Sequence, residues 1–219
     1  MKFYFKLLLQ LLVFTAFSCA NAGSYDDFFS AIGTDNAALV NKLLVRGFDA
    51  NTRNTKGEHP LIVAVRASSL KVVDVLLANP ATNVDVRTPQ DETPLMLAAL
   101  NGYDDICQKL IARDADVNKP GWTPLHYAAT NGHVSTIRLL LDHYAYIDAA
   151  SPNGSTPLMM AAQYGSAAAV KVLLESGADP SLKNNLGLNA IDFANTANRF
   201  DSAALIASYI RAQRPKGSW

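Results

Sequence analysis

The chain has 219 residues and a formal net charge of zero, with 49% hydrophobic and 17% charged residues. This is the composition of a globular protein, because a disordered chain is poorer in apolar residues and richer in charge. The sequence holds no block of like charges. We therefore expect neither nucleic acid nor an acidic membrane surface as a partner.

The first 22 residues have the three parts of a cleavable signal peptide. Two lysines, Lys2 and Lys6, precede the apolar run Leu7–Phe17, and the small-residue site Ala20-Asn21-Ala22 follows it. The run is much shorter than the roughly 20 residues that a membrane-spanning helix needs. These features predict cleavage after Ala22 and export to a periplasm or to the outside, without membrane contact after cleavage.

Two other interpretations of this segment stay open. It could remain as a membrane anchor, or a lipid could be attached at Cys19, although Ala16-Phe17-Ser18 lacks the leucine usual three positions upstream. Cleavage would remove Cys19 and leave one cysteine, Cys107. A single cysteine forms no internal disulfide, so packing alone would stabilise the exported fold.

Residues 23–213 contain a repeated pattern. Similar segments recur at steps of 34, 30, 33 and 33 residues, the last copy being degenerate. They are His59–Val65, Thr93–Ala99, Thr123–Ala129, Thr156–Ala162 and Asn189–Ala194. A threonine before a proline suits a helix start, since its hydroxyl caps free N–H groups and proline at the first position loses no needed donor.

A second helix is predicted in each unit, because apolar residues recur there at helical spacing. These helices are expected over Leu70–Leu77, Asp104–Ile111, Val134–Leu141 and Ala168–Leu174. Gly102, Gly132 and Gly165 stand between the two helices of a unit, where a tight turn favours glycine.

These units resemble the ankyrin repeat. Thr123–Ala128 matches the family pattern T-P-L-H-x-A, and Gly177–Ser181 resembles its exit segment. The resemblance implies an all-α solenoid of helix-turn-helix units with β-turn fingers, with about six repeats including two capping repeats. It covers nearly all of residues 23–213, leaves residues 214–219 as a tail, and leaves no room for a separate catalytic domain.

The 30-residue step marks a departure from the pattern. Elsewhere six positions separate the exit segment from the finger glycine, but only three separate Asn118 from Gly121. This predicts a blunted finger before Trp122 and a notch in the row of fingers. Loop lengths also drift at surfaces without functional meaning. A second departure is Tyr144, which replaces the exit glycine and predicts a turn that is either strained or differently shaped.

Motifs for chemistry are missing from the sequence: it has no phosphate-binding loop, zinc-hydrolase motif, CxxC pair or nucleophile elbow. His126 and His133 stand where the family commonly has a histidine that supports neighbouring turns by hydrogen bonding. Cys107 aligns with core positions and is expected to be a small buried hydrophobe. We therefore expect no cofactor, no metal site and no enzymatic activity.

The resemblance implies that partners meet the finger tips and the exposed side of the first helices. The mapped finger residues are Lys56, Glu58, Gln90, Glu92, Trp122, Asn153 and Ser155. The mapped helix residues are Arg66, Leu100, Asn101, Thr130, Asn131, Gln163 and Tyr164. Trp122 and Tyr164 are the expected anchors, since exposed aromatic residues dominate interfaces. Trp122 could instead pack against the neighbouring finger.

The sequence thus predicts an exported, monomeric module that binds an unidentified protein partner. An enzyme or cofactor carrier on the same face is one alternative, and it would need converging titratable groups. A homo-oligomeric scaffold is another. Fold alone does not choose the partner.

Overall fold

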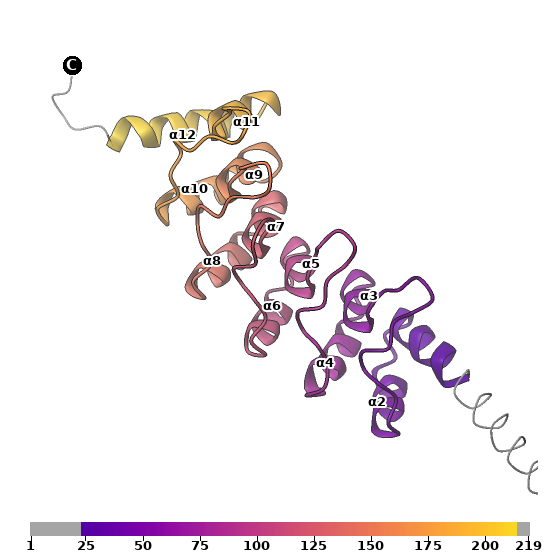
Figure 1. The fold of residues 1–219 in the computed structure, drawn as a ribbon. Helices are drawn as coiled ribbons and strands as arrows, with labels where there is room; N and C mark the ends of the chain where they lie inside the picture. The colour runs from indigo at the N-terminus through magenta and orange to yellow at the C-terminus, as the bar shows by residue number, and fades with distance from the viewer. Residues whose placement is uncertain (1–22, 214–219) are drawn as a thin grey trace, which may run out of the picture. The chain divides into compact units, whose positions relative to one another are not determined.

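The computed structural model describes residues 23–213, and the predicted signal peptide and tail lie outside these residues (Figure 1). All regular secondary structure in this part of the chain is helical, as the resemblance predicted. The helices form six successive pairs: residues 23–33 with α2 (Ala37–Val45), α3 (Pro60–Arg66) with α4 (Leu70–Ala78), α5 (Pro94–Leu100) with α6 (Asp104–Ile111), α7 (Pro124–Asn131) with α8 (Val134–Asp142), α9 (Pro157–Gln163) with α10 (Ala167–Glu175), and α11 (Ala190–Thr196) with α12 (Phe200–Gln213). They divide into two compact units, one ending at Asn83 and one beginning at Val84.

Unit 1, the described residues up to Asn83, packs around α4, which contacts both α2 and α3. Its first helix contributes Phe28 and Ile32, which are fully buried. The Phe28 ring lies 4.4 Å from that of Phe48, centroid to centroid. Burial of such aromatic rings supplies much of the hydrophobic stabilisation of a small unit.

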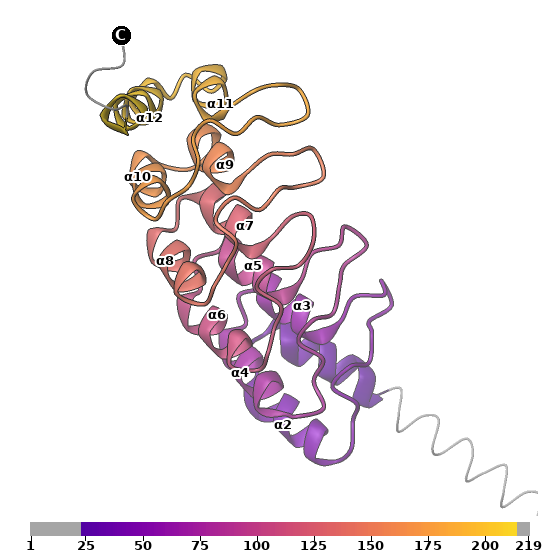
Figure 2. The same ribbon diagram turned by 60° about the vertical axis from the view of Figure 1, so that its left-hand side comes forward.

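Unit 2, from Val84 onward, stacks its helices in two rows (Figures 1 and 2). The first helices α5, α7, α9 and α11 pack in succession, and so do the second helices α6, α8, α10 and α12. Leu95, Leu125 and Leu158 are fully buried within the first row. The loops before α7, α9 and α11 project to one side of this unit as fingers (Figure 2).

The first helices begin as the threonine-proline pairs predicted. The side chains of Thr93, Thr123 and Thr156 accept hydrogen bonds from the backbone N–H three residues on, and a proline follows each of them. Each cap satisfies one of the N–H groups that a helix start leaves without a partner.

Four fingers share one hairpin, which begins at Asn54, Thr88, Ser151 or Asn184. The backbone N–H of that residue donates to the carbonyl four residues on, at 2.9 to 3.0 Å. Its side-chain oxygen accepts from the N–H of that same later residue. Each of these fingers is therefore closed by hydrogen bonds within its own hairpin.

The turns between paired helices depend on glycine in two ways. Gly102 and Gly132 have left-handed φ angles of 67° and 69°, as a tight turn requires. Gly165 does not have a left-handed φ. The prediction that a tight turn requires glycine at this position was therefore wrong. A Cβ at Gly165 would lie 2.4 Å from the carbonyl oxygen of Ala129, and glycine is needed there for close approach. Tyr144 has φ 63°, which confirms the predicted strain at that exit turn.

Candidate functional site

The finger between α6 and α7 is shortened, as its spacing predicted. Asn118, at the start of this finger, is hydrogen-bonded to the exit turn after α8. Its Nδ2 donates to the carbonyl of Tyr144 at 2.8 Å, and its Oδ1 accepts from the N–H of Tyr146 at 2.7 Å. Only residues 119–122 then lead to the cap of α7 at Thr123. Among the described residues, no hairpin hydrogen bond of the kind shared by the other fingers closes this segment.

A buried lysine closes the shortened finger instead. Lys119 is 2% exposed, and its Nζ donates to the carbonyl oxygens of Pro120 at 3.0 Å and Trp122 at 3.4 Å. The same ammonium forms an ion pair with Asp91 on the preceding finger of unit 2. The sequence analysis did not identify Lys119 or Asp91 as functional residues. The missing finger residues were a usable signal, because carbonyls that lose their hairpin hydrogen bonds need another donor.

Asp91 stands where a finger normally has glycine. Its φ is 64°, in the left-handed region. The equivalent residues of the other fingers are Gly57, Gly121, Gly154 and Gly187. The hydrogen bond from Lys119 holds the pKa of the Asp91 carboxyl below its ordinary value, and Arg87, at 3.0 Å, acts in the same direction. The carboxylate is therefore charged at neutral pH.

Trp122 lies half-buried beside an open pocket of about 200 Å³. The other residues that line it come from the first-helix row of unit 2: Leu100, Tyr127, Thr130 and Met160. Except for a threonine and the tyrosine hydroxyl, these side chains are apolar. The ring of Trp122 meets that of His126 edge to face, with centroids 5.2 Å apart. This is an exposed apolar pocket with an aromatic wall, a common feature of protein interfaces.

His126 has the structural role that the sequence predicted. Its Nδ1 accepts from the N–H of Thr123 at 3.2 Å, and its Nε2 donates to the carbonyl of Ser155 at 3.0 Å. Burial lowers the pKa of His126 to about 4, so the ring is neutral at pH 7. His133 also supports a turn, through a 3.0 Å hydrogen bond to the carbonyl of Leu100. Both histidine rings therefore stabilise neighbouring turns through hydrogen bonds.

The predicted partner-binding residues are divided between the two units. Lys56, Glu58 and Arg66 lie in unit 1, where Lys56 is exposed at a finger tip and Glu58 pairs with Arg66 at 3.0 Å. A surface ion pair of this kind contributes little to stability. The remaining predicted residues lie in unit 2.

In unit 2, three of the residues predicted to contact a partner also form hydrogen bonds within the fold. Thr130 donates to the carbonyl of His126, Asn101 to that of Leu97, and Asn131 to that of Leu100. Solvent reaches, fully or in part, the predicted residues Gln90, Glu92, Leu100, Asn101, Trp122, Thr130, Asn131, Asn153, Gln163 and Tyr164. Tyr164 is 53% exposed at the end of α9 but does not line the Trp122 pocket.

The placement of Ser155 at an accessible finger position was wrong. Ser155 is fully buried. Its N–H donates to the Oγ of Ser151 at 3.0 Å, and its carbonyl accepts from His126, so both backbone groups hold it at the finger base. Its own Oγ has no hydrogen-bond partner among the described residues.

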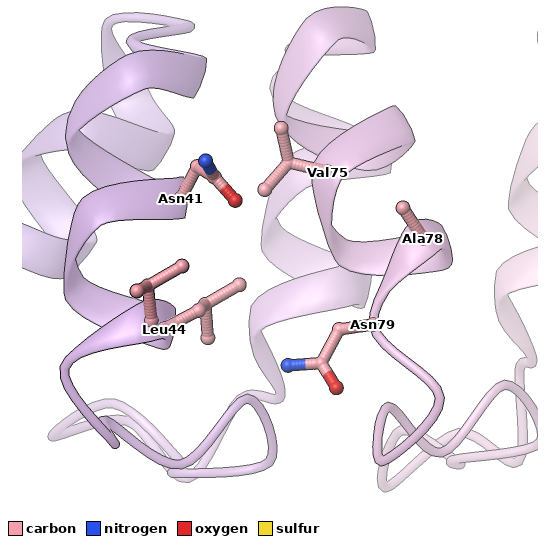
Figure 3. A pocket seen from close by; sticks show the side chains of 6 residues that line it. Asn41, Leu44, Val75, Ala78 and Asn79 are labelled. Atoms are coloured by element: carbon pink, nitrogen blue, oxygen red, sulfur yellow. The ribbon is translucent and has the colours of Figure 1, made fainter.

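A second pocket lies in unit 1 between α2 and α4, with a volume of about 230 Å³ (Figure 3). It is lined by Asn41, Leu44, Val45, Val75, Ala78 and Asn79. Its polar side chains are two amides, which do not titrate, so it offers no acid–base chemistry.

Cys107 offers no nucleophile, since burial raises the pKa of its thiol to about 12. Over residues 23–213, no three His, Cys, Asp or Glu side chains cluster so that they could hold a metal ion. Within the same residues, no helix combines the length and hydrophobicity that crossing a membrane requires.

The family model described as ankyrin repeats in three copies matches residues 28–120 and 116–184. The chain belongs to the ankyrin-repeat family. It is 36% identical over 123 residues to neurogenic locus notch homolog protein 1 of Homo sapiens, a match that covers 55% of this chain and 5% of that protein. It is 32% identical over 163 residues to the tyrosine-protein kinase Shark of Drosophila melanogaster, covering 73% and 17%. The ankyrin-repeat chain therefore spans a small part of these relatives.

One solved structure matches a larger share of both chains than these relatives do. It is a chain from the complex of the predatory endopeptidase Bd0816 from Bdellovibrio bacteriovorus with the immunity protein Bd3460. The TM-score is 0.73 and the sequence identity 29%, and the match covers 83% of this chain and 97% of that chain. Ankyrin repeats are protein-interaction modules, so the family itself indicates a protein partner for this chain.

Proposed function

We propose that this protein is an exported ankyrin-repeat module that binds a partner protein on the fingers and first helices of unit 2. The observation that carries the proposal is the open apolar pocket walled by Trp122 and Tyr127. The protein is proposed to act as a monomer, which sedimentation would show as a mass independent of concentration.

The surroundings of the pocket support a binding role. Interfaces are most stable where a buried aromatic anchor is surrounded by polar groups that exclude water. In unit 2 such polar groups include Gln90, Asn101 and Gln163, which are exposed or half-buried. Trp122 supplies a large ring whose position is already set by its contact with His126. A pre-set anchor loses little conformational entropy on binding.

The partner is proposed to be an exported hydrolase, which this chain would hold inactive. Support comes from the solved complex named above, which joins an endopeptidase to an immunity protein and whose matching chain is aligned over 97% of its length. In that proposal the chain contributes no catalysis itself. It covers the partner enzyme by shape and by apolar contact.

The Trp122→Ala variant tests the site. Removing a central aromatic anchor is expected to weaken partner binding by about 30-fold or more, the usual effect at an interface hot spot. The partner is first captured from the native compartment with the tagged wild-type protein, and its affinity is then measured by titration calorimetry. Tyr146→Ala is the matched control, since Tyr146 is 67% exposed in unit 2 and lies outside the pocket. Equal affinity of Trp122→Ala and wild type would show that the partner binds somewhere other than the Trp122 pocket.

Export is tested by fractionating cells that express the full chain and weighing the purified protein by mass spectrometry. We expect a periplasmic or secreted product that begins at Gly23, because the three-part pattern of residues 1–22 is that of a cleaved signal. An intact chain in the cytoplasm would contradict export. A chain retained in the membrane with a lipid on Cys19 would replace soluble export with anchoring.

A further inference from the structure

The deletion in the shortened finger creates a structural problem that Lys119 solves. A full finger closes through its own backbone bonds, as in the 3.0 Å bond from the N–H of Thr88 to the carbonyl of Glu92. Residues 119–122 are too few for this hairpin, and the carbonyls of Pro120 and Trp122 accept from Lys119 instead. A lysine ammonium has three donors, and its three acceptors here are these two carbonyls and Asp91.

Asp91 is the unusual partner in this arrangement. A residue other than glycine is strained in the left-handed region, and the other fingers avoid this strain with glycine. Aspartate tolerates this conformation better than most residues, and it brings a carboxylate. The backbone conformation at this position thus favours glycine, whereas the ion pair with Lys119 requires the acid.

We propose that Asp91 and Lys119 are positioning residues for partner binding: their ion pair fixes the shortened finger so that Trp122 is held at the wall of its pocket. The inference rests on the proposed function, because it assigns a role within the same site. The main chain of Trp122 is held by Lys119 and its ring contacts His126, so the anchor is fixed at two points. Without the pair, the finger would have to become ordered on binding, and affinity would fall.

Asp91→Gly is the main test, because it removes the carboxylate side chain and restores the residue that the other fingers use at this left-handed position. We expect the variant to stay folded but to lose some thermal stability, because the relief of backbone strain offsets only part of the cost of leaving Lys119 buried without the carboxylate. Affinity for the captured partner should fall about 10-fold, as the ordering cost of a few side chains implies. Lys119→Met, which removes the charge from the buried position, is expected to weaken binding at least as much. Asp114→Gly is the matched control: Asp114 is an exposed aspartate of unit 2 with φ 61°, and its replacement should leave affinity unchanged.

A second readout needs no partner. The chain has two tryptophans, so in a Trp219→Phe background the fluorescence reports Trp122 alone. Acrylamide should quench Trp122 more strongly in Asp91→Gly than in wild type, because the finger is no longer fixed. Unchanged quenching in both Asp91→Gly and Lys119→Met overturns the inference. So does an unchanged affinity of Asp91→Gly when Trp122→Ala has lost binding.

The two readouts also separate this inference from the proposed function. Equal affinity of Trp122→Ala and wild type refutes the proposed site, and the role of the pair in binding is refuted with it. Increased quenching in the same experiment would still establish that Asp91 and Lys119 fix the finger. Loss of binding in Trp122→Ala, Asp91→Gly and Lys119→Met, with increased quenching in the last two, supports both.

Discussion

Leu125→Ala should lower the free energy of unfolding of unit 2 by about 2–5 kcal/mol, the range found for large-to-small changes in a packed core. Leu125 is fully buried in α7, which packs against both α5 and α9. The lost methyl groups would leave a cavity that two neighbouring helices line. Because repeats support their neighbours, the amides of α5 and α9 should also exchange hydrogen faster.

Urea denaturation and hydrogen exchange measure this effect. Leu186→Ala is the matched control, since it is the same substitution in the same unit at a side chain that is 81% exposed. That variant is expected to stay within about 0.5 kcal/mol of wild type. Equal midpoints for Leu125→Ala and wild type would contradict the burial of Leu125 among α5, α7 and α9.

The protein should lose stability as the pH falls from about 6.5 to about 4. Burial lowers the pKa of His126 from 6.5 to about 4, and the pKa of His59 in unit 1 is lowered to about 4, mainly by burial. In this window the unfolded histidine takes up a proton and the folded one stays neutral, so each proton bound favours unfolding. The contribution of His126 is complete above pH 6.5 and decreases by about 3 kcal/mol by pH 4.

The measurement is the free energy of unfolding by urea between pH 7.5 and 4.5. The His126→Gln variant should be less stable at pH 7, because it loses the bonds to Thr123 and Ser155, but its stability should change less with pH. His143→Gln is the control, since His143 is exposed at the end of α8. An NMR titration that places the pKa of His126 near 6.5 would contradict this explanation.

Leu125 and His126 both lie in α7, which is part of the scaffold that holds the candidate site. His126 links the cap of α7 to the finger before α9 and also contacts the ring of Trp122. The folded ring takes up its proton only near pH 4, so its protonation should disturb the pocket at the acid end of this window, after much of the stability has been lost.

The repeat architecture could be predicted from local sequence patterns alone. The threonine-proline starts, the buried leucines such as Leu125 and the step near 33 residues are local and periodic, so the pattern alone predicts paired helices and their order. The shortened finger could also be predicted, because a missing length is visible in a single alignment of units. Family position likewise predicted that His126 supports neighbouring turns.

The closure of the shortened finger, by contrast, depends on contacts between residues that are far apart in the sequence. The ion pair between Asp91 and Lys119 joins residues 28 positions apart, and no periodic pattern predicts such a pair. The burial of Ser155 also depends on a contact with the preceding repeat of unit 2, through His126. Gly165 is required by the approach of the Ala129 carbonyl, a distance that exists only once α7 and α9 have packed. Local propensity determines the helices of each repeat, whereas contacts between neighbouring repeats decide which side chains remain accessible to a partner.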